Sequence, residues 1–275
     1  MRTQRVTVPE LRRKKERGEK IAVLTAYDAT MARLLDRAGV DALLVGDSLG
    51  MVVLGHETTL PVTIEQMVHH TQAVTRGATR ALVIADMPFL SYQVSIPEAV
   101  RNAGRLLKEG GAAAVKLEGG QPILDVVKRL VDIGIPVMGH LGLQPQSVNR
   151  LGGYGKQATS PADADVLAAD ARSLAEAGAF AIVLESIPAD LARAVTASLS
   201  IPTIGIGAGP DCDGQVLVSY DMLGLFDGFV PSFVKQYAHL AETVVEAART
   251  YVEDVREKQF PASPASVADV PRPGR

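Results

Sequence analysis

Charged side chains follow four apolar runs of the sequence, at the point where each run ends. The runs are DALLVGD, ALVIAD, AAVKLE and FAIVLE, and the charged residues at their ends are Asp47, Asp86, Lys116, Glu118 and Glu185. Continuous apolar runs of this length are typical of strands buried on both faces of a parallel sheet. Ligands bind at the carboxyl ends of such strands in parallel α/β folds. We therefore expect these side chains to converge on one mouth of the fold.

Asp47 and Asp86 are candidates for a metal site. Two carboxylates at neighbouring strand ends can share a hard divalent cation, and Mg²⁺ is commonly held by one or two carboxylates while it keeps several waters. Glu118 could add a third ligand, directly or through water. The alternative is that each carboxylate only caps the loop or helix that follows it. The sequence has no cluster of His and Cys residues that would favour zinc instead.

Lys116 and Glu118 are two residues apart, so their side chains point to the same side of a strand. A lysine inside a barrel mouth must be paired or lose its charge. Beside a metal-bound anion, Lys116 could stabilise developing negative charge, and the alternative is a structural ion pair with Glu118. Glu185 ends a more distant strand, where it could act across the mouth as a general base or be a buried ion-pair partner.

Three further features are weaker candidates. The glycine-rich segment 205–209 follows an expected strand, where barrels often bind phosphate, although a plain tight turn is the stronger explanation. His140 is expected in a loop at the same mouth. The single cysteine, Cys212, lies between Asp211 and Asp213, whose charge disfavours a reactive thiolate, so we expect it to be inert.

Strands and helices alternate along the chain. The expected strands are 21–26, 41–46, 81–85, 113–117, 137–139, 180–184, 203–206 and 228–230. The expected helices are 28–38, 63–76, 95–110, 123–133, 163–177, 189–199, a short piece at 219–225, and 233–257. Alternation implies parallel strands with right-handed crossovers, and eight units indicate closure into a barrel.

The predicted fold is therefore α/β, a single (β/α)₈ TIM barrel over residues 1–258 with a helical lead-in within residues 1–20. An open doubly wound sheet is the alternative, but no G-x-G-x-x-G follows the first strand. Residues 259–275 are rich in Pro, Ala and Ser and are predicted to be a disordered tail.

Composition narrows the functional classes. The net charge of −3 argues against a general nucleic-acid or anionic-membrane binder. One cysteine allows no disulfide framework, and the basic start of the chain has no apolar segment typical of a secretory signal. No stretch approaches the roughly 18 apolar residues of a membrane span. We expect a soluble, cytoplasmic protein.

Several long segments resemble one enzyme family. They are LVGDSLGMVVLGHETTLPVT, VIADMPFLSY, AVKLEGG, VMGHLGLQPQSV, LES and IPTIGIGAGPDCDGQVLVSYDMLGLF. Together they are similar to ketopantoate hydroxymethyltransferase over about residues 6–257. The resemblance implies a barrel of the phosphoenolpyruvate/pyruvate-like superfamily and transfer of a one-carbon unit from 5,10-methylenetetrahydrofolate to 3-methyl-2-oxobutanoate. The product would be 2-dehydropantoate, in pantothenate biosynthesis.

The resemblance also implies roles for single residues. Asp47 and Asp86 would bind one Mg²⁺ per subunit, with Glu118 in the metal's shell, and both aspartates would lie at the substrate. Ser48 and Lys116 would contact the keto acid. The remaining implied role is that of Glu185 as the proton acceptor. Family members are typically large homo-oligomers, often decamers.

Two other classes of function remain open at this stage. The same barrel with carboxylate-bound Mg²⁺ could serve a lyase or mutase of oxo acids, but such enzymes are expected to carry a catalytic cysteine loop, and Cys212 has the wrong surroundings. A metabolite-binding barrel without catalysis is the other class. Converging acids and a lysine without catalytic use would be costly to stability, which counts against it.

Overall fold

The structure is a computed structural model that describes residues 5–261. The chain divides into two compact units, Met1–Ser219 and Tyr220–Arg275, and each is described here by itself. The first unit contains the whole barrel. Residues 262–275 of the predicted tail lie outside the described part, so disorder of the tail stays a prediction.

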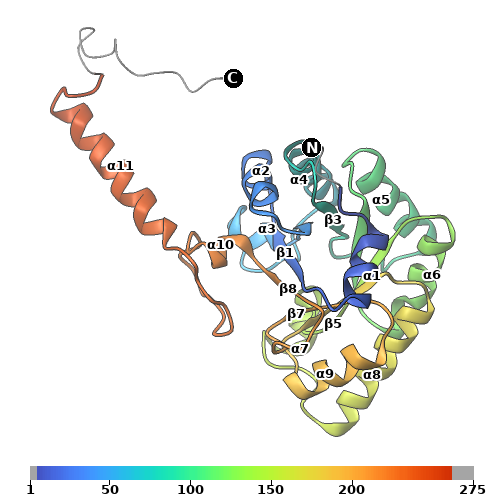
Figure 1. Cartoon of the computed structure of the whole chain (residues 1–275). Coiled ribbons are helices and arrows are strands. Elements are labelled where there is room, and N and C mark those ends of the chain that lie inside the picture. The colour runs from blue at the N-terminus through green and yellow to red at the C-terminus, as the bar shows by residue number, and fades with distance from the viewer. Residues whose placement is uncertain (1–4, 262–275) are drawn as a thin grey trace. The chain divides into compact units, whose positions relative to one another are not determined.

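Eight parallel strands close into a barrel in sequence order (Figure 1). They are β1 Ile21–Thr25, β2 Ala42–Val45, β3 Leu82–Asp86, β4 Ala114–Glu118, β5 Val137–Gly142, β6 Ala181–Glu185, β7 Thr203–Ile206 and β8 Gly214–Leu217. Strand β8 pairs with both β1 and β7, which closes the sheet. The (β/α)₈ barrel predicted from the sequence is confirmed.

Helices connect most of the strands. In the first unit they are α1 Val8–Glu16, α2 Ala29–Ala38, α3 Leu49–Val52, α4 Ile64–Gly77, α5 Ile96–Lys108, α6 Leu124–Asp132, α7 Val148–Leu151, α8 Pro161–Glu176 and α9 Ala189–Ser198, with the 3₁₀ turns η1 Gln121–Ile123 and η2 Pro145–Ser147. They are followed by α10 Ser219–Met222 and α11 Leu240–Arg256. Within residues 5–261, no helix combines the length and apolar character needed to cross a bilayer.

The eighth strand lies earlier in the chain than predicted. It was expected at 228–230, but β8 is Gly214–Leu217, and only the loop 207–213 separates it from β7. The expectation is wrong because it assumes a helix between these strands. Gly214 packs directly against β1, where an added Cβ would clash with the backbone oxygen and the Cβ of Ile21, so the close pairing requires glycine.

Helix α1 covers the amino-terminal end of the barrel. Leu11 of α1 is fully buried, and with Val6 it joins the cluster formed by inward-facing strand residues such as Ile21 and Ile204. The helical lead-in predicted from the sequence is confirmed in α1. Because α1 closes the amino-terminal end, the charged residues gather at the opposite end, where the strands have their carboxyl ends.

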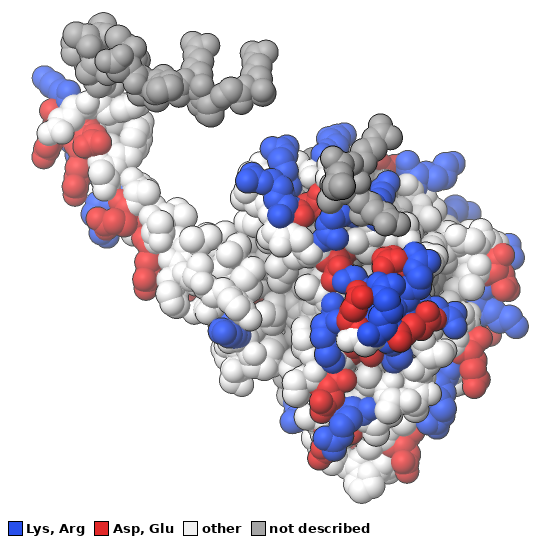
Figure 2. Space-filling model, viewed as in Figure 1, with Lys and Arg blue, Asp and Glu red and all other residues white. Residues whose placement is uncertain are grey.

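Charges of both signs mix on the face that carries α1 (Figure 2). Two lysines of this helix form partly buried ion pairs. Lys14 Nζ lies 3.0 Å from an Asp41 carboxylate oxygen, and Lys15 Nζ lies 2.7 Å from Asp213. These pairs tie α1 to residues that immediately precede β2 and β8.

A buried carboxylate on α2 organises the start of β3. Asp36 accepts hydrogen bonds from the backbone N–H groups of Thr79 and Ala81 at 2.9 and 2.7 Å, and from the Thr79 hydroxyl at 2.8 Å. Burial by itself would raise the pKa of Asp36, but these hydrogen bonds outweigh it and lower the pKa. The carboxylate therefore sets where β3 begins and, four residues later, where Asp86 lies.

Replacing Asp36 with Asn should lower the free energy of unfolding at pH 7 by about 1–3 kcal/mol, because buried donors lose an acceptor. The folded-state pKa is lowered, so the stabilisation is present above the unfolded-state pKa and is lost as pH falls through the folded-state pKa. Urea unfolding at several pH values should show that the difference in free energy of unfolding between wild type and Asp36→Asn becomes smaller in acid. Asp165→Asn, at an exposed aspartate, serves as the control. A difference in free energy of unfolding between wild type and Asp36→Asn that does not change with pH would contradict the role of the charge.

Candidate active site

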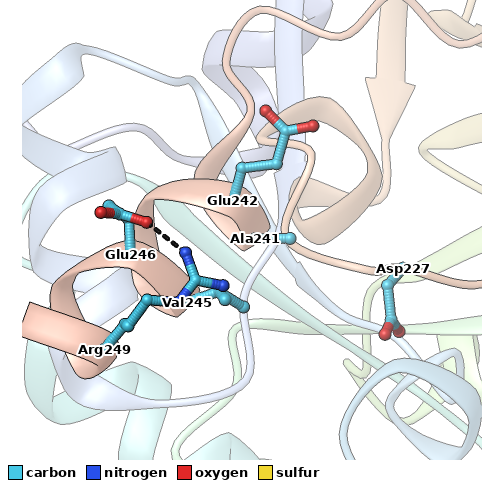
Figure 3. Close-up of a pocket in the computed structure, with 6 residues that line it drawn as sticks. All are labelled: Asp227, Ala241, Glu242, Val245, Glu246 and Arg249. Carbon is cyan, nitrogen blue, oxygen red and sulfur yellow. Dashed lines mark hydrogen bonds and ion pairs between the residues drawn. The ribbon is translucent and has the colours of Figure 1, made fainter. Parts of the chain in front are cut away.

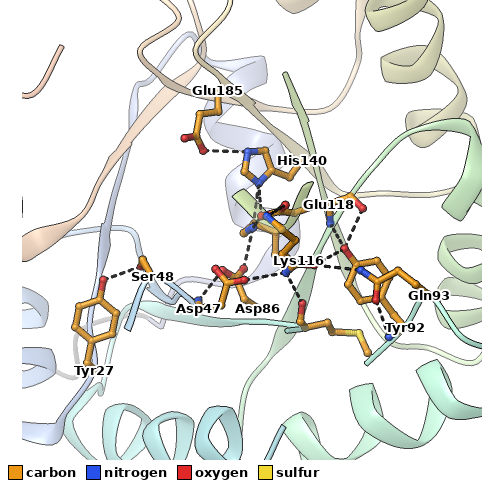
Figure 4. A network of polar contacts seen from close by, with 12 residues as sticks. Tyr27, Asp47, Ser48, Asp86, Tyr92, Gln93, Lys116, Glu118, His140 and Glu185 are labelled. Atoms are coloured by element: carbon orange, nitrogen blue, oxygen red, sulfur yellow. Dashed lines mark hydrogen bonds and ion pairs between the residues drawn. The ribbon is translucent and has the colours of Figure 1, made fainter. Parts of the chain in front are cut away.

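Inward-facing positions change from apolar to charged along the strands that follow β2. In β3, Leu82 and Ile84 face the barrel core, and Asp86 continues the same alternation. The same period of two places Lys116 and Glu118 of β4, His140 of β5 and Glu185 of β6 on the inner side (Figure 4). The predicted convergence of these side chains at the carboxyl end is therefore observed.

Lys116 lies at the centre of this group. Its Nζ is 3.0 Å from Asp86 Oδ1, 3.9 Å from Glu118 Oε1 and 3.1 Å from His140 Nδ1. The side chains of Lys116, Asp86 and Glu118 are almost completely buried. The pairing follows from the sheet, because Asp86 is in register with Lys116 and Glu118 is in register with His140.

Asp47 and Ser48 reach the site from the turn after β2. The backbone N–H of Asp47 donates to Asp86 Oδ2 at 3.1 Å, and the Ser48 hydroxyl lies 2.8 Å from that of Tyr27. Gly46 makes this turn possible, since a Cβ there would come within 2.8 Å of Ser48 Oγ. Asp47 and Asp86 therefore lie together, as expected from the sequence.

His140 connects the lysine to the predicted base. Its Nε2 lies 3.1 Å from Glu185 Oε2, and its Nδ1 lies 3.5 Å from Glu118 Oε1 (Figure 4). Sequence reasoning placed this histidine in a loop, but β5 extends to Gly142 and carries it inside the barrel. Its spacing from Met138, which also faces inward, is the sequence signal that could have identified it.

Burial and the Lys116 charge lower the pKa of His140, but contacts with Glu118 and Glu185 outweigh them and raise the pKa to about 9. His140 Nε2 faces Glu185 at ion-pair distance but is not aligned for a hydrogen bond with the described residues. Burial lowers the pKa of Lys116 as well, yet the surrounding carboxylates, led by Asp86, raise the pKa above its usual value. Lys116 therefore stays an ammonium group.

The carboxylates differ in their acidity. Burial raises the pKa of Asp47 well above its usual range, and the charges of Asp86 and Glu118 add to this effect. Burial also raises the pKa of Asp86, although Lys116 opposes it. For Glu118, burial would raise the pKa, but His140 and Lys116 together lower it. If all three carboxylates were ionised, they would carry more negative charge than Lys116 balances, which is consistent with the raised pKa values of the two aspartates.

Three residues of this network carry no sequence prediction. Gln146, in η2, donates from Nε2 to Asp47 Oδ2 at 2.8 Å, and its backbone N–H donates to Glu118 Oε2 at 3.0 Å. The Tyr92 hydroxyl and Gln93 Nε2 both contact Gln146 Oε1. The sequence alone could not have identified Gln146 as the residue that makes these contacts. Gln144, two residues earlier, has the same side chain and is an equally plausible candidate.

The arrangement of the carboxylates is more consistent with two of them binding Mg²⁺ directly than with three. Within residues 5–261, no three His, Cys, Asp or Glu side chains converge closely enough to coordinate one ion as they stand. Asp86 Oδ1 is buried and receives no aligned hydrogen bond from the described residues, only the Lys116 ammonium nearby. Asp47 and Asp86 with several waters would suit Mg²⁺.

The remaining candidates lie apart from this group. Cys212 is fully buried, and burial is the main cause that raises the pKa of its thiol, consistent with the expected inert cysteine. Gly209 has φ of 83°, and its carbonyl accepts a hydrogen bond from Gln215. Phosphate binding by segment 205–209 stays a prediction, and the described contacts of this segment suit a tight turn.

Buried acids, a lysine and a histidine at the carboxyl ends of parallel strands define a (β/α)₈-barrel enzyme site. The family model of ketopantoate hydroxymethyltransferase matches residues 5–263. The chain therefore belongs to the ketopantoate hydroxymethyltransferase family and is a transferase.

Curated relatives are similar to this chain along its length. The 3-methyl-2-oxobutanoate hydroxymethyltransferase of Moorella thermoacetica is 63% identical over 257 residues, covering 94% of this chain and 96% of that protein. The enzyme of the same name from Carboxydothermus hydrogenoformans is 57% identical over 267 residues, covering 97% of each.

More distant solved structures share the fold alone. A phosphoenolpyruvate phosphomutase from Streptomyces platensis subsp. rosaceus has a TM-score of 0.63 at 14% identity, covering 96% of this chain and 92% of that one. A 2,3-dimethylmalate lyase has a TM-score of 0.60 at 19% identity, covering 95% and 91%.

Replacing Lys116 with Met should destabilise the protein by about 3–5 kcal/mol at pH 8, because it leaves buried carboxylates unpaired. Without the ammonium the folded-state pKa values of these carboxylates should rise, and an acid with a raised folded-state pKa loses stability as pH increases. Urea unfolding in EDTA should therefore show a smaller deficit at pH 5 than at pH 8. The exposed Lys128→Met is the matched control, and an equal deficit at both pH values would contradict this explanation.

Proposed function

We propose that this chain transfers a hydroxymethyl group from 5,10-methylenetetrahydrofolate to 3-methyl-2-oxobutanoate, giving 2-dehydropantoate in pantothenate biosynthesis. The observation that carries the proposal is the alignment of Lys116, His140 and Glu185 beside Asp47 and Asp86 in a chain of this family. Relatives named for this substrate cover nearly the whole chain, which supports the same assignment.

Asp47 and Asp86 would hold one Mg²⁺ per subunit, with Glu118 in the shell around it. Bound there, the ion would act as a Lewis acid that stabilises negative charge on the keto oxygen of the oxo acid. Lys116 would add a second positive charge beside that oxygen. Ser48 would contact the oxo acid as well, with its hydroxyl oriented by Tyr27.

Glu185 is the proposed general base. Its side chain is 16% exposed, compared with 4% for Lys116, so it is more open to the mouth than the groups beneath it. His140 would donate to Oε2 and leave the other oxygen to accept the proton from C3 of the oxo acid. Removing this proton makes C3 nucleophilic while Lys116 balances the charge that moves to oxygen.

The carbon–carbon bond would form when C3 attacks the methylene carbon of the folate donor. The bonds from that carbon to the folate nitrogens break, and water supplies the hydroxyl oxygen of the product. Exposed apolar side chains on the loops after β3 and β5, among them Phe89, Leu90 and Tyr154, offer surface for a planar donor ring. The pKa of Tyr154 is raised first by burial and then by Asp47 and Glu185, which places this ring near the mouth.

Replacing Glu185 with Gln should reduce exchange of the C3 proton of 3-methyl-2-oxobutanoate in D₂O by about 10²–10⁴-fold, because the base is lost. Proton NMR follows the signal with and without Mg²⁺, and with and without tetrahydrofolate. Binding of Mg²⁺ and of the oxo acid should remain close to wild type. Adding the methylene donor to the wild type should then give 2-dehydropantoate.

The exposed Glu176→Gln provides the matched control for this experiment and should exchange as the wild type does. EDTA should stop exchange in the wild type, and Mg²⁺ should restore it. Folded wild-type protein that neither exchanges the proton nor forms product would overturn the proposal. A carbon–carbon or phosphorus–carbon cleavage activity in its place would support a lyase or mutase of the same superfamily.

We further propose that the chain works in the cytoplasm.

We also propose that the chain forms a homo-oligomer, and the family resemblance implies a decamer. Helix α11 has no buried residue, and Val244, Tyr251 and Val255 on one stripe of it are exposed. A pocket of about 380 Å³ lies beside this helix, lined by Asp227, Ala241, Glu242, Val245, Glu246 and Arg249 (Figure 3). An exposed apolar stripe of this kind supports burial against a second copy.

Replacing Val244 with Glu should lower the molecular mass of the assembly, because it places a charge in the apolar stripe of α11. Light scattering on eluted protein measures the mass against the 29.1 kDa of one chain. Thr250→Glu, which adds the same charge on the opposite side of the helix, should leave the mass unchanged. A wild-type protein that elutes as a monomer would refute the oligomer.

A further inference from the structure

Gln146 is the most connected polar residue of the mouth that the proposed chemistry does not use. It lies in η2, is 6% exposed, and reaches groups that belong to three other strands or the loops after them. Nε2 donates to Asp47 Oδ2 at 2.8 Å and to the Met87 carbonyl at 2.9 Å. Its backbone N–H donates to Glu118 Oε2 at 3.0 Å.

The orientation of this amide is determined by its neighbours. Its nitrogen faces the Asp47 carboxylate and the Met87 carbonyl oxygen, so the nitrogen is the donor to both. Its oxygen faces Tyr92 Oη at 2.9 Å and Gln93 Nε2 at 3.2 Å. A flipped amide would place oxygen against two acceptors, which makes the observed orientation the one the network permits.

Tyr92 extends the same network to the backbone of β4. Its buried hydroxyl accepts a hydrogen bond from the N–H of Glu118 at 3.1 Å while it contacts Gln146. Gln146 and Tyr92 therefore hold the Glu118 backbone and one of its carboxylate oxygens at the same time. Two carboxylates from different strands are thus restrained by one turn after β5.

We propose that Gln146 is a positioning residue that presents Asp47 and Glu118 for cation binding. The inference rests on the proposed function, in which Asp47 and Asp86 hold Mg²⁺. With Oδ2 of Asp47 engaged by the amide, rotation of the carboxylate is restrained and Oδ1 is left for the ion. Hydrogen-bonded partners of metal ligands typically contribute about 10–100-fold to metal affinity or activity.

The test is direct titration with Mn²⁺ in the absence of both substrates, followed by the EPR signal of the free ion. Replacing Gln146 with Met keeps the length and bulk of the side chain but removes the hydrogen bonds of its amide, while the backbone N–H can still donate to Glu118. We expect affinity to fall by about 10–100-fold. Gln121→Met, at the exposed glutamine that begins the 3₁₀ turn η1, is the matched control and should bind as the wild type does.

A second variant keeps the test decisive if Gln146→Met does not fold. Tyr92→Phe leaves Gln146 in place but removes the hydroxyl that orients it, so it should weaken Mn²⁺ binding in the same direction by a smaller factor. If both folded variants act through one network, the double variant should lose less than the product of the two separate losses. Independent losses would contradict a shared network.

Magnesium dependence of proton exchange separates positioning from a general loss of structure. At low Mg²⁺ the C3 exchange by Gln146→Met should be slower than wild type, and a 100-fold higher concentration should recover most of it. No such recovery is expected for Glu185→Gln. A Gln146→Met deficit that is the same at every concentration overturns the inference.

The outcomes distinguish this inference from the proposed function. Wild type that binds Mn²⁺ together with a folded Gln146→Met that binds it equally well would overturn the role of Gln146 and leave the metal proposal standing. Wild type without saturable Mn²⁺ binding would refute both. If the wild type binds Mn²⁺ and only the Gln146 and Tyr92 variants bind it more weakly, both the metal proposal and the role of Gln146 are supported.

Discussion

The buried ammonium of Lys116 is the interaction on which the mouth of the barrel depends. A charge removed from water is tolerated only with compensating partners, and here these are the carboxylates of Asp86 and Glu118, with the His140 ring beside them. These three residues come from β3, β4 and β5, and no single strand could supply them. Their meeting therefore requires the barrel to close with these strands adjacent and in the observed register.

Register links this polar group to the core beneath it. Because side chains alternate along a strand, the residues that fill the barrel interior and the residues that reach the mouth belong to the same inward-facing rows. A slip of one residue in β4 would turn Lys116 toward the surrounding helices and Ala114 away from the core. Packing of the apolar layers thus enforces the contacts of the charged layer, and stability and site geometry share one cause.

The sequence predicts most of the fold because seven strands are clear apolar runs separated by helices with recognisable ends. It fails at β8, whose four residues follow β7 after a short loop and include an exposed glutamine. Asp86, Lys116 and Glu185 are predictable from their place at strand ends. His140 is predicted at the mouth but in a loop, because the predicted strand ends too early, at residue 139, whereas β5 extends to Gly142. Gln146 is not predictable, since its contacts depend on loops distant in sequence.

Charge balance connects the network to the cation it is proposed to hold. Asp47, Asp86 and Glu118 could carry three negative charges against the one positive charge of Lys116, and a protonated His140 would offset one more. Burial without enough cations raises the pKa values of Asp47 and Asp86, so keeping both carboxylates ionised is costly in the isolated chain. A divalent cation would neutralise the same excess while leaving Lys116 and His140 free to face the substrate, which is why its place beside the two aspartates suits the electrostatics of the barrel mouth.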